Sequence, residues 1–232
     1  MKRQDKTYNN SNDRREGFND EQKKNINESL DLDKKALILI NEGKFLEAEE
    51  IYRKIILIGN NKHISYRNLA LLCGMRGDKG QMVKFLNCAI EIKSDYPEAH
   101  NDLGLAYKSK GDIKLAIISY KRAISFDSKC SVFYFNLGTA YLEQGALTPA
   151  IENFKRAIEI QSNYYHAYNN LGIALKRNGC IKESISSFKN AIKINSSDPD
   201  AYTNLGNAQK EDRDLDNAII SYKKAIEIDP NI

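Results

Sequence analysis

The sequence predicts an all-α protein, an α-solenoid in which six helix–turn–helix units stack into a right-handed superhelix. Three observations support this prediction: a 34-residue repeat, apolar residues at helical spacing within each repeat, and a glycine midway through most repeats. The predicted superhelix spans residues 29–232, in units 29–62, 63–96, 97–130, 131–164, 165–198 and 199–232. Residues 1–28 precede it as a separate segment.

The repeat is visible as similar strings at a fixed interval. Four of them, each 34 residues after the last, are NDLGLAYKSKGD from Asn101, FNLGTAYLEQGA from Phe135, NNLGIALKRNGC from Asn169 and TNLGNAQKEDRD from Thr203. Weaker copies in the same phase begin at Asp33 and Arg67. A fixed period without insertions is typical of stacked structural repeats.

Each unit divides into two predicted amphipathic helices. Apolar residues recur at positions 4, 7, 8 and 11, and again at positions 17, 20, 21, 24, 27, 28 and 30, which is helical spacing. In the fourth unit we expect Thr148 to cap the second helix, with Pro149 at its first position. Position 15, between the helices, is a glycine that can end the first helix in the left-handed conformation in five units: Gly43, Gly77, Gly111, Gly145 and Gly179.

Residue size predicts how the two helices of a unit pack. Position 8 is alanine or glycine in all six units, position 20 is small in five, and position 24 is tyrosine or phenylalanine in five. The small residues let the two helices approach closely, and the rings fill the space beside them. Because one such hairpin cannot bury its apolar face alone, consecutive units are expected to stack.

These residues resemble the tetratricopeptide repeat, a 34-residue helix–turn–helix with leucine–glycine, tyrosine, alanine, phenylalanine and proline at set offsets. The resemblance covers residues 29–232. The chain departs from the signature because it has no tryptophan, Lys35 occupies a leucine position and Arg213 replaces the turn glycine. The resemblance implies a concave groove lined by the first helices of the units.

The N-terminal segment, residues 1–28, carries seven basic and six acidic side chains, and only Tyr8, Phe18 and Ile26 are apolar enough to join a core. So little apolar surface does not offset the entropy lost on ordering, so we expect the segment to be largely disordered, up to about residue 20. A short helix running into Leu30 is expected to cover the first unit. The balanced charges argue against a basic arm that binds nucleic acid.

Composition argues against several partners and compartments. The net charge of +4, from 35 basic and 31 acidic residues, is too balanced to indicate nucleic acid or a membrane as partner. The longest aliphatic run, residues 36–40, is far shorter than the roughly 20 residues that cross a bilayer, and no apolar stretch follows Met1 as in a signal peptide. The four cysteines form no C-x-x-C pair and suit a reducing compartment. We therefore expect a cytoplasmic protein.

No set of residues indicates catalysis, a metal or a cofactor. His63, His100 and His166 occupy different repeat positions, so no catalytic or metal-binding cluster is expected. We expect His100 in the core, and only His166 on a face that meets a ligand. The glycines of CGMRGDKG lack the strand and the lysine of a phosphate-binding loop. The prediction is a protein that is not an enzyme.

The candidate binding surface is the groove face of the first helices. This face carries positions 2, 5, 6, 9, 12 and 13 when positions 4, 7, 8 and 11 pack inward. Position 6 forms a row of Asn68, Asp102, Asn136, Asn170 and Asn204. An exposed amide can bond both the carbonyl and the N–H of a main chain, so the row suits an extended peptide. The other candidate groove residues are Arg67, Leu71, Asn101, Leu105, Lys108, Phe135, Asn169, Lys176, Arg177 and Lys210.

The row of asparagines within N-L-G also resembles the repeats of O-linked N-acetylglucosaminyltransferase and its SPINDLY-like relatives. The resemblance implies a role in holding substrate peptides for Asn68, Asn136, Asn170 and Asn204, whereas Asp102 keeps only the acceptor. N-L-G is also common in other tetratricopeptide arrays, so a shared repeat consensus explains the row equally well. The carboxylate clamp of chaperone-binding arrays is not matched, because its required positions hold Arg67, Leu71, Val132 and Asn136.

The sequence therefore predicts a non-enzymatic interaction scaffold that binds a peptide or a partner surface in its groove. The alternative is the substrate-recruiting part of a glycosyltransferase-like or other enzyme, with a catalytic domain that is downstream or lost. No helix follows Ile219, Tyr222 and Ile226 of the last unit in this sequence, so we expect them to be partly exposed. Either the natural chain continues and covers them, or this end docks on another molecule, of which a second copy of the chain is one example.

Overall fold

A computed structural model describes residues 19–59 and 61–231, and these residues form twelve α-helices. The chain divides into two compact units, which we call unit 1 (Met1–Ser94) and unit 2 (Asp95–Ile232). We call the six predicted 34-residue segments repeats 1 to 6. Unit 1 contains α1 (Asp20–Asn41), α2 (Phe45–Ile58), α3 (Lys62–Met75) and α4 (Lys79–Ile92). Unit 2 contains α5 (Pro97–Ser109), α6 (Ile113–Phe126), α7 (Ser131–Gln144), α8 (Leu147–Ile160), α9 (Tyr165–Arg177), α10 (Ile181–Ile194), α11 (Pro199–Glu211) and α12 (Leu215–Ile228).

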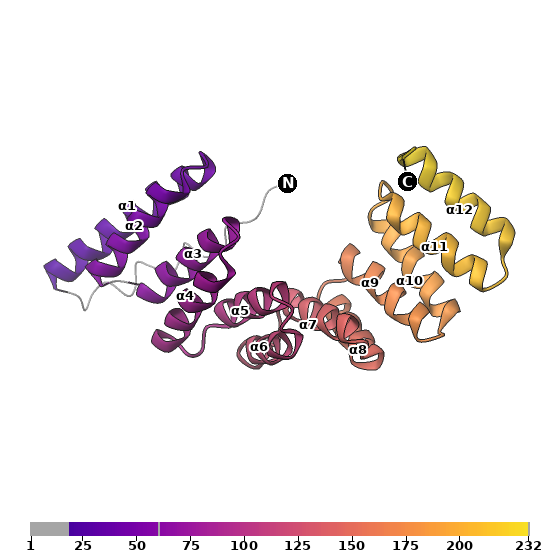
Figure 1. Cartoon of the computed structure of the whole chain (residues 1–232), viewed down its shortest axis with the longest axis horizontal. Helices are drawn as coiled ribbons and strands as arrows, with labels where there is room; N and C mark the ends of the chain where they lie inside the picture. Colours follow the sequence, from indigo (N-terminus) through magenta and orange to yellow (C-terminus); the bar gives the residue numbers. More distant parts are fainter. Residues whose placement is uncertain (1–18, 60, 232) are drawn as a thin grey trace. The chain divides into compact units, whose positions relative to one another are not determined.

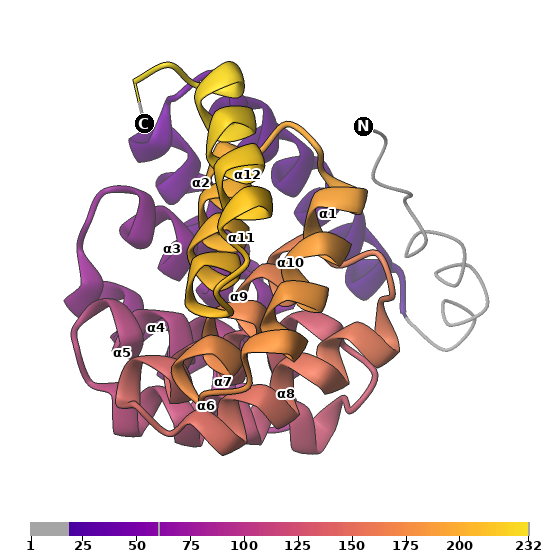
Figure 2. The ribbon, with the colours of Figure 1, turned by 90° about the vertical axis from the view of Figure 1, so that its right-hand side faces the viewer.

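The helices pack in the order that the repeat predicts. Each odd-numbered helix lies against the even-numbered helix that follows it, as α11 and α12 do in both views (Figures 1 and 2). Within unit 1, α2 also lies against α3, and within unit 2, α6, α8 and α10 lie against α7, α9 and α11, the first helices of the next repeats. The predicted all-α solenoid of stacked hairpins is therefore confirmed over the described residues.

The turn between the two helices of a repeat has the expected conformation. The five glycines at position 15 all have positive φ, between 76° and 85°. Arg213, which replaces this glycine in repeat 6, adopts the same left-handed region with φ 65°. The turn geometry is thus retained where the glycine is lost, at a conformational cost that a non-glycine residue carries.

The size pattern at positions 8 and 24 also has the expected result. A Cβ atom built on Gly172 would lie 2.5 Å from the ring of Phe188, and one on Gly138 would lie 2.8 Å from the ring of Phe154. Phe154 and Phe188 are fully buried. In repeats 3 to 6, the absence of a side chain at position 8 therefore lets the two helices of the hairpin approach this closely.

The core of unit 2 is a succession of clusters, each shared by two adjacent repeats. Tyr120 of repeat 3 packs with Leu137 of repeat 4, Phe154 of repeat 4 with Leu171 of repeat 5, and Phe188 of repeat 5 with Leu205 of repeat 6. His100 is 8% exposed and stacks on Phe126 with 5.4 Å between ring centroids, which confirms its expected place in the core.

Unit 1 has a corresponding core, and an ion-pair network links its two repeats. Glu49 on α2 accepts from Arg53 on the same helix, with 2.7 Å between Nη2 and Oε1, and from Arg76 beyond α3, with 2.8 Å between Nη2 and Oε2. The hydrogen bond from Arg53 is the main reason that the pKa of the Glu49 carboxyl lies below its ordinary value. This carboxylate therefore helps to hold the first two hairpins together.

Two local expectations need correction or refinement. α8 begins at Leu147, with Ala146 as its N-cap, so Thr148 is not the cap and lies with Pro149 in the first turn. The expected helix running into Leu30 is present, but it is the start of α1, which begins at Asp20 with a capping box formed by Asn19 and Gln22. The expectation of disorder for residues 1–18 lies outside the described residues.

Three apolar residues of α12 were expected to be partly exposed, and the structure confirms this. Ile219 and Ile226 are 51% and 53% exposed, and Tyr222 is half-buried. The equivalent residues of repeat 4, Ile151 and Phe154, are buried in the core cluster shared with repeat 5. None of the described helices is both long enough and apolar enough to span a membrane.

Candidate functional site

The fifteen predicted groove residues fall into two sets because the chain forms two units. Arg67, Asn68 and Leu71 lie half-buried on α3 of unit 1. The other twelve lie on α5, α7, α9 and α11, the first helices of repeats 3 to 6, in unit 2. Unit 2 therefore carries most of the candidate surface.

At two of the junctions between repeats in unit 2, an asparagine side chain of one repeat donates a hydrogen bond to an asparagine side chain of the repeat before it. Asn136 Nδ2 on α7 donates to Asn101 Oδ1 on α5 at 2.8 Å, at the junction of repeats 3 and 4. Asn204 Nδ2 on α11 donates to Asn169 Oδ1 on α9 at 3.3 Å, at the junction of repeats 5 and 6. Position 6 of one repeat thus bonds position 5 of the repeat before it.

These bonds correct the expectation that the row of amides is freely accessible. Asn136, Asn170 and Asn204 are half-buried, and Asp102 and Asn101 are buried, at 5% and 6% exposure. Half-buried amides that already bond a neighbouring repeat contribute to the stability of the stack. At these two junctions the row is at least partly structural.

Each of these two junctions also has an ion pair, between the lysine at position 12 of the earlier repeat and the glutamate at position 13 of the later repeat. Lys108 Nζ on α5 lies 3.1 Å from Glu143 Oε1 on α7, and Lys176 Nζ on α9 lies 3.8 Å from Glu211 Oε2 on α11. Two of the predicted groove lysines, Lys108 and Lys176, therefore have carboxylate partners within the protein.

The junction between repeats 4 and 5 lacks both connections, and we call it the central junction. Its residues on the groove face are Phe135 and Leu142 from α7 and His166, Asn170 and Arg177 from α9. Phe135 occupies the position of Asn101 and Asn169, and Leu142 occupies that of Lys108 and Lys176. Within the part of the chain that the structure describes, the Asn170 amide has no hydrogen-bond partner and the exposed Arg177 guanidinium has no carboxylate partner.

An aromatic cluster takes the place of the asparagine pair at the central junction. The ring centroid of Phe135 lies 5.9 Å from that of Phe154, 5.1 Å from that of Tyr164 and 6.3 Å from that of His166. Phe135 is half-buried and His166 is exposed, so part of the cluster faces solvent. His166 is thus on an accessible face, as the sequence predicts. Its contact with Phe135 was not predicted from the sequence.

Tyr165 adds a buried hydroxyl next to this cluster. Its ring meets that of His166 edge-on, with 5.0 Å between centroids. The hydroxyl oxygen is buried and has no hydrogen-bond partner among the described residues. Tyr165 was not among the predicted site residues, because position 1 of a repeat is outside the groove face that helical spacing defines.

In unit 1 the position-6 amide again bonds within the protein. Asn68 forms a hydrogen bond with the Tyr52 hydroxyl, which acts to lower the pKa of that group. Burial, assisted by the nearby Asp33 carboxylate, outweighs this bond and raises the pKa of Tyr52 to about 12. Burial likewise raises the pKa of Asp33 above its ordinary value. Asn68 therefore has a structural partner, like Asn136 and Asn204.

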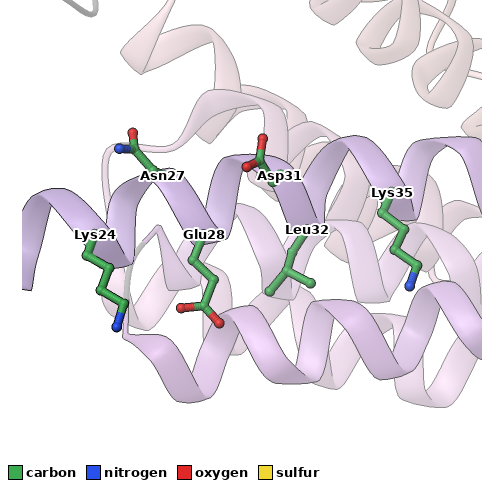
Figure 3. A pocket seen from close by; sticks show the side chains of 6 residues that line it. All are labelled: Lys24, Asn27, Glu28, Asp31, Leu32 and Lys35. Atoms are coloured by element: carbon green, nitrogen blue, oxygen red, sulfur yellow. The ribbon is translucent and has the colours of Figure 1, made fainter.

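A hollow of about 690 Å³ lies on α1, and it has neither an aromatic cluster nor residues from a second helix. All its lining residues come from one helix, and Figure 3 shows most of them pointing to the same side of it. The lining combines both charges, in Lys24, Asn27, Glu28, Asp31, Leu32 and Lys35. Because one helix cannot enclose a ligand, this hollow is an open surface and not a candidate site. Within the described ranges, no group of histidine, cysteine, aspartate and glutamate has a geometry that could hold a metal ion.

Comparisons with known proteins agree with this architecture. A family model described as TPR repeat matches residues 104–145, 138–179 and 180–212, and one described as tetratricopeptide repeat matches residues 199–232. Together the two models span more than half of the chain. No curated protein sequence matches it.

Solved structures show the same fold. A crystal structure of MamA is 25% identical with a TM-score of 0.66, and the match covers 68% of this chain and 93% of that one. YrrB, described as a TPR protein with an unusual peptide-binding site, is 24% identical with a TM-score of 0.67, over 77% of this chain and 92% of that one. MamA from Desulfovibrio magneticus RS-1 is 18% identical with a TM-score of 0.70, over 75% and 97%.

The 34-residue period, the packed helical hairpins and these matches lead to one conclusion: the chain belongs to the tetratricopeptide repeat family.

Proposed function

We propose that this protein is an interaction scaffold that binds an extended peptide of a partner on the first-helix face of unit 2. One observation supports the proposal above all others. The central junction combines a solvent-facing aromatic cluster with an amide and a guanidinium that have no partners among the described residues. At the junctions on either side, the equivalent groups are bonded to one another.

The chemistry of these groups suits a peptide. The side-chain amide of Asn170 can donate to a main-chain carbonyl and accept from a main-chain N–H. Rings such as Phe135 and His166 provide a rigid apolar surface for a ligand side chain, and aromatic residues are frequent anchors at protein interfaces. YrrB, a solved structure of the same fold, is described as having a peptide-binding site, but the proposal rests on the residues of this chain.

Four expectations from the sequence stay predictions. A role without catalysis, a cytoplasmic location and the absence of nucleic-acid partners are among them. So is the alternative role as the recruiting part of a glycosyltransferase-like enzyme. Asn136 and Asn204, on which that resemblance depends, bond the neighbouring repeat, so these two side chains add little support for it.

The test uses a substitution that the fold already accepts. Phe135→Asn gives the central junction the residue found at the same position of repeats 3 and 5, removes the ring and offers Asn170 a partner. Random 12-residue peptides displayed on phage are selected on the full chain, and the enriched peptides are then measured by fluorescence anisotropy. We expect Phe135→Asn to lower their affinity at least tenfold while the helical circular dichroism spectrum is retained.

A matched control places the same kind of change elsewhere. Ile118 on α6 is 63% exposed, so Ile118→Asn replaces an apolar residue on the surface of the same unit with asparagine. It should leave peptide affinity unchanged. Failure to enrich any peptide, or equal affinities for the wild type and Phe135→Asn, would overturn the proposed function.

A further inference from the structure

The charge distribution around the central junction indicates what kind of peptide fits it. Arg177 occupies position 13 of repeat 5, where repeats 4 and 6 carry the acidic Glu143 and Glu211. Those two carboxylates are paired with Lys108 and Lys176. Lys210, exposed at position 12 of repeat 6, has no ion-pair partner among the described residues. The edge of the groove face at positions 12 and 13 therefore has unpaired positive charge.

The opposite edge of the same face carries negative charge. Position 2 holds Glu98 in repeat 3 and Asp200 in repeat 6, both of them exposed. Between them at this position lie Val132 and His166, beside the aromatic cluster. A ligand carboxylate is therefore favoured at the Arg177 edge and disfavoured at the position-2 edge, which gives the surface a polarity.

The spacing of the unpaired groups defines a distance along the ligand. Asn170 and Arg177 are seven residues apart on α9, and at a rise of about 1.5 Å per residue they are separated by about 10.5 Å along the helix axis. An extended peptide advances about 3.3 Å per residue, so this separation corresponds to about three residues. The length and flexibility of the arginine side chain widen the range to between two and four residues.

We propose that the central junction selects acidic peptides in which an apolar side chain rests on Phe135 and an aspartate or glutamate, two to four residues from the residue that Asn170 binds, pairs with Arg177. This inference rests on the proposed function and adds the chemistry of its ligand. Phe135 and His166 supply the apolar contact, Asn170 bonds the intervening main chain, and Arg177 determines the charge preference. A planar guanidinium suits a carboxylate because it can donate two parallel hydrogen bonds.

The test is a charge exchange between the protein and its ligand. A phage-selected peptide is synthesised with its glutamate intact, replaced by glutamine and replaced by lysine, and each is measured against the wild type, Arg177→Gln and Arg177→Glu. With the wild type, we expect the glutamine peptide to bind about three- to fivefold more weakly than the glutamate peptide, which is the upper end of the range for a solvent-exposed ion pair. The difference should shrink as salt is raised, because ions screen exposed charges.

The variants separate a recognition role from a general effect of charge. Arg177→Gln should bind the glutamate and glutamine peptides within a factor of two of each other. Arg177→Glu should prefer the lysine peptide, which a purely structural role of Arg177 does not predict. Lys155→Gln, which removes the same charge from an exposed position of α8, should retain the wild-type preference for glutamate.

Each contrary outcome has a distinct meaning. Enriched peptides without an acidic residue, or an Arg177→Glu variant that still prefers the glutamate peptide, would overturn the inference. If such peptides nevertheless lose affinity with Phe135→Asn, the proposed function stands and only the charge preference is wrong. If no peptide is enriched, the proposed function and this inference both fail.

Discussion

Replacing Asn136 with alanine removes the amide that donates to Asn101 Oδ1 across the junction of repeats 3 and 4 at 2.8 Å. Asn101 is only 6% exposed, so water cannot easily supply the lost donor. A buried polar group that loses its partner costs about 1 to 3 kcal/mol. The half-buried environment of Asn136 places our expectation near 1 kcal/mol, which corresponds to a lowering of the melting temperature by about 2 to 4 °C for a chain of this length.

Two further asparagine variants provide the comparison. Asn204→Ala removes a longer bond, of 3.3 Å to Asn169, and should cost about 0.5 to 1 kcal/mol. Asn170→Ala removes an amide without a partner among the described residues, so it should leave the melting temperature unchanged or slightly higher, because alanine is the better helix former. That gain in propensity is common to all three variants, so their differences report the hydrogen bonds.

The assay is thermal and urea unfolding followed by circular dichroism, together with affinity for the selected peptides. Asn170→Ala should weaken peptide binding without loss of stability, and Asn136→Ala should lose stability with a smaller effect on binding. The reasoning is refuted if Asn170→Ala destabilises the protein as much as Asn136→Ala does. It is also refuted if Asn136→Ala leaves the unfolding curve unchanged.

Four other predictions concern stability and assembly. Gly172→Ala places a Cβ atom 2.5 Å from the ring of Phe188 and should destabilise unit 2 by about 1 to 3 kcal/mol, measured by urea unfolding. Leu137→Ala, at a side chain that is 4% exposed, should cost about 2 to 5 kcal/mol in the same assay. Burial raises the pKa of Asp33 above its ordinary value of 3.8. The protonated Asp33 side chain therefore favours the folded state at low pH, and this contribution is lost as pH rises through the folded-state pKa. Asp33→Asn should accordingly raise the melting temperature at pH 7 but not at pH 3. Self-association through α12 should raise the mean mass in light scattering as concentration increases, and Ile219→Lys should abolish the increase.

The fold was predictable because it depends on local patterns that are repeated. A helical hairpin needs apolar residues at helical spacing, small residues where the helices meet and a turn that can enter the left-handed region. All three are periodic in the sequence, and the structure confirms them at Gly138, Gly145 and Phe154. The start of α8 was predicted wrongly because Thr148 and Pro149 are good residues both for a cap and for a first turn, and local preference alone does not choose between them.

The candidate site was predictable only as a set of positions. Helical spacing assigned Phe135, Asn170 and Arg177 to the groove face, and the structure places all three on the first helices of unit 2. The sequence did not show that Asn136 and Asn204 are already bonded to the preceding repeat. Those bonds join residues 35 positions apart, and their existence depends on how closely two hairpins stack.

The sequence by itself determined the period, the two helices of each repeat, the turns between them and the residues that fill the core, because each of these is specified by neighbours within one hairpin. The tertiary structure alone decided which polar side chains are bonded to a neighbouring repeat. Hydrogen bonds and ion pairs between repeats depend on distances of about 3 Å across a junction, and a single replacement, such as Phe135 for asparagine, changes whether the facing amide is satisfied. For that reason Asn136, Asn170 and Asn204, which occupy equivalent positions in the sequence, differ in the folded protein. Asn136 and Asn204 bond the preceding repeat, and Asn170 has no hydrogen-bond partner among the described residues.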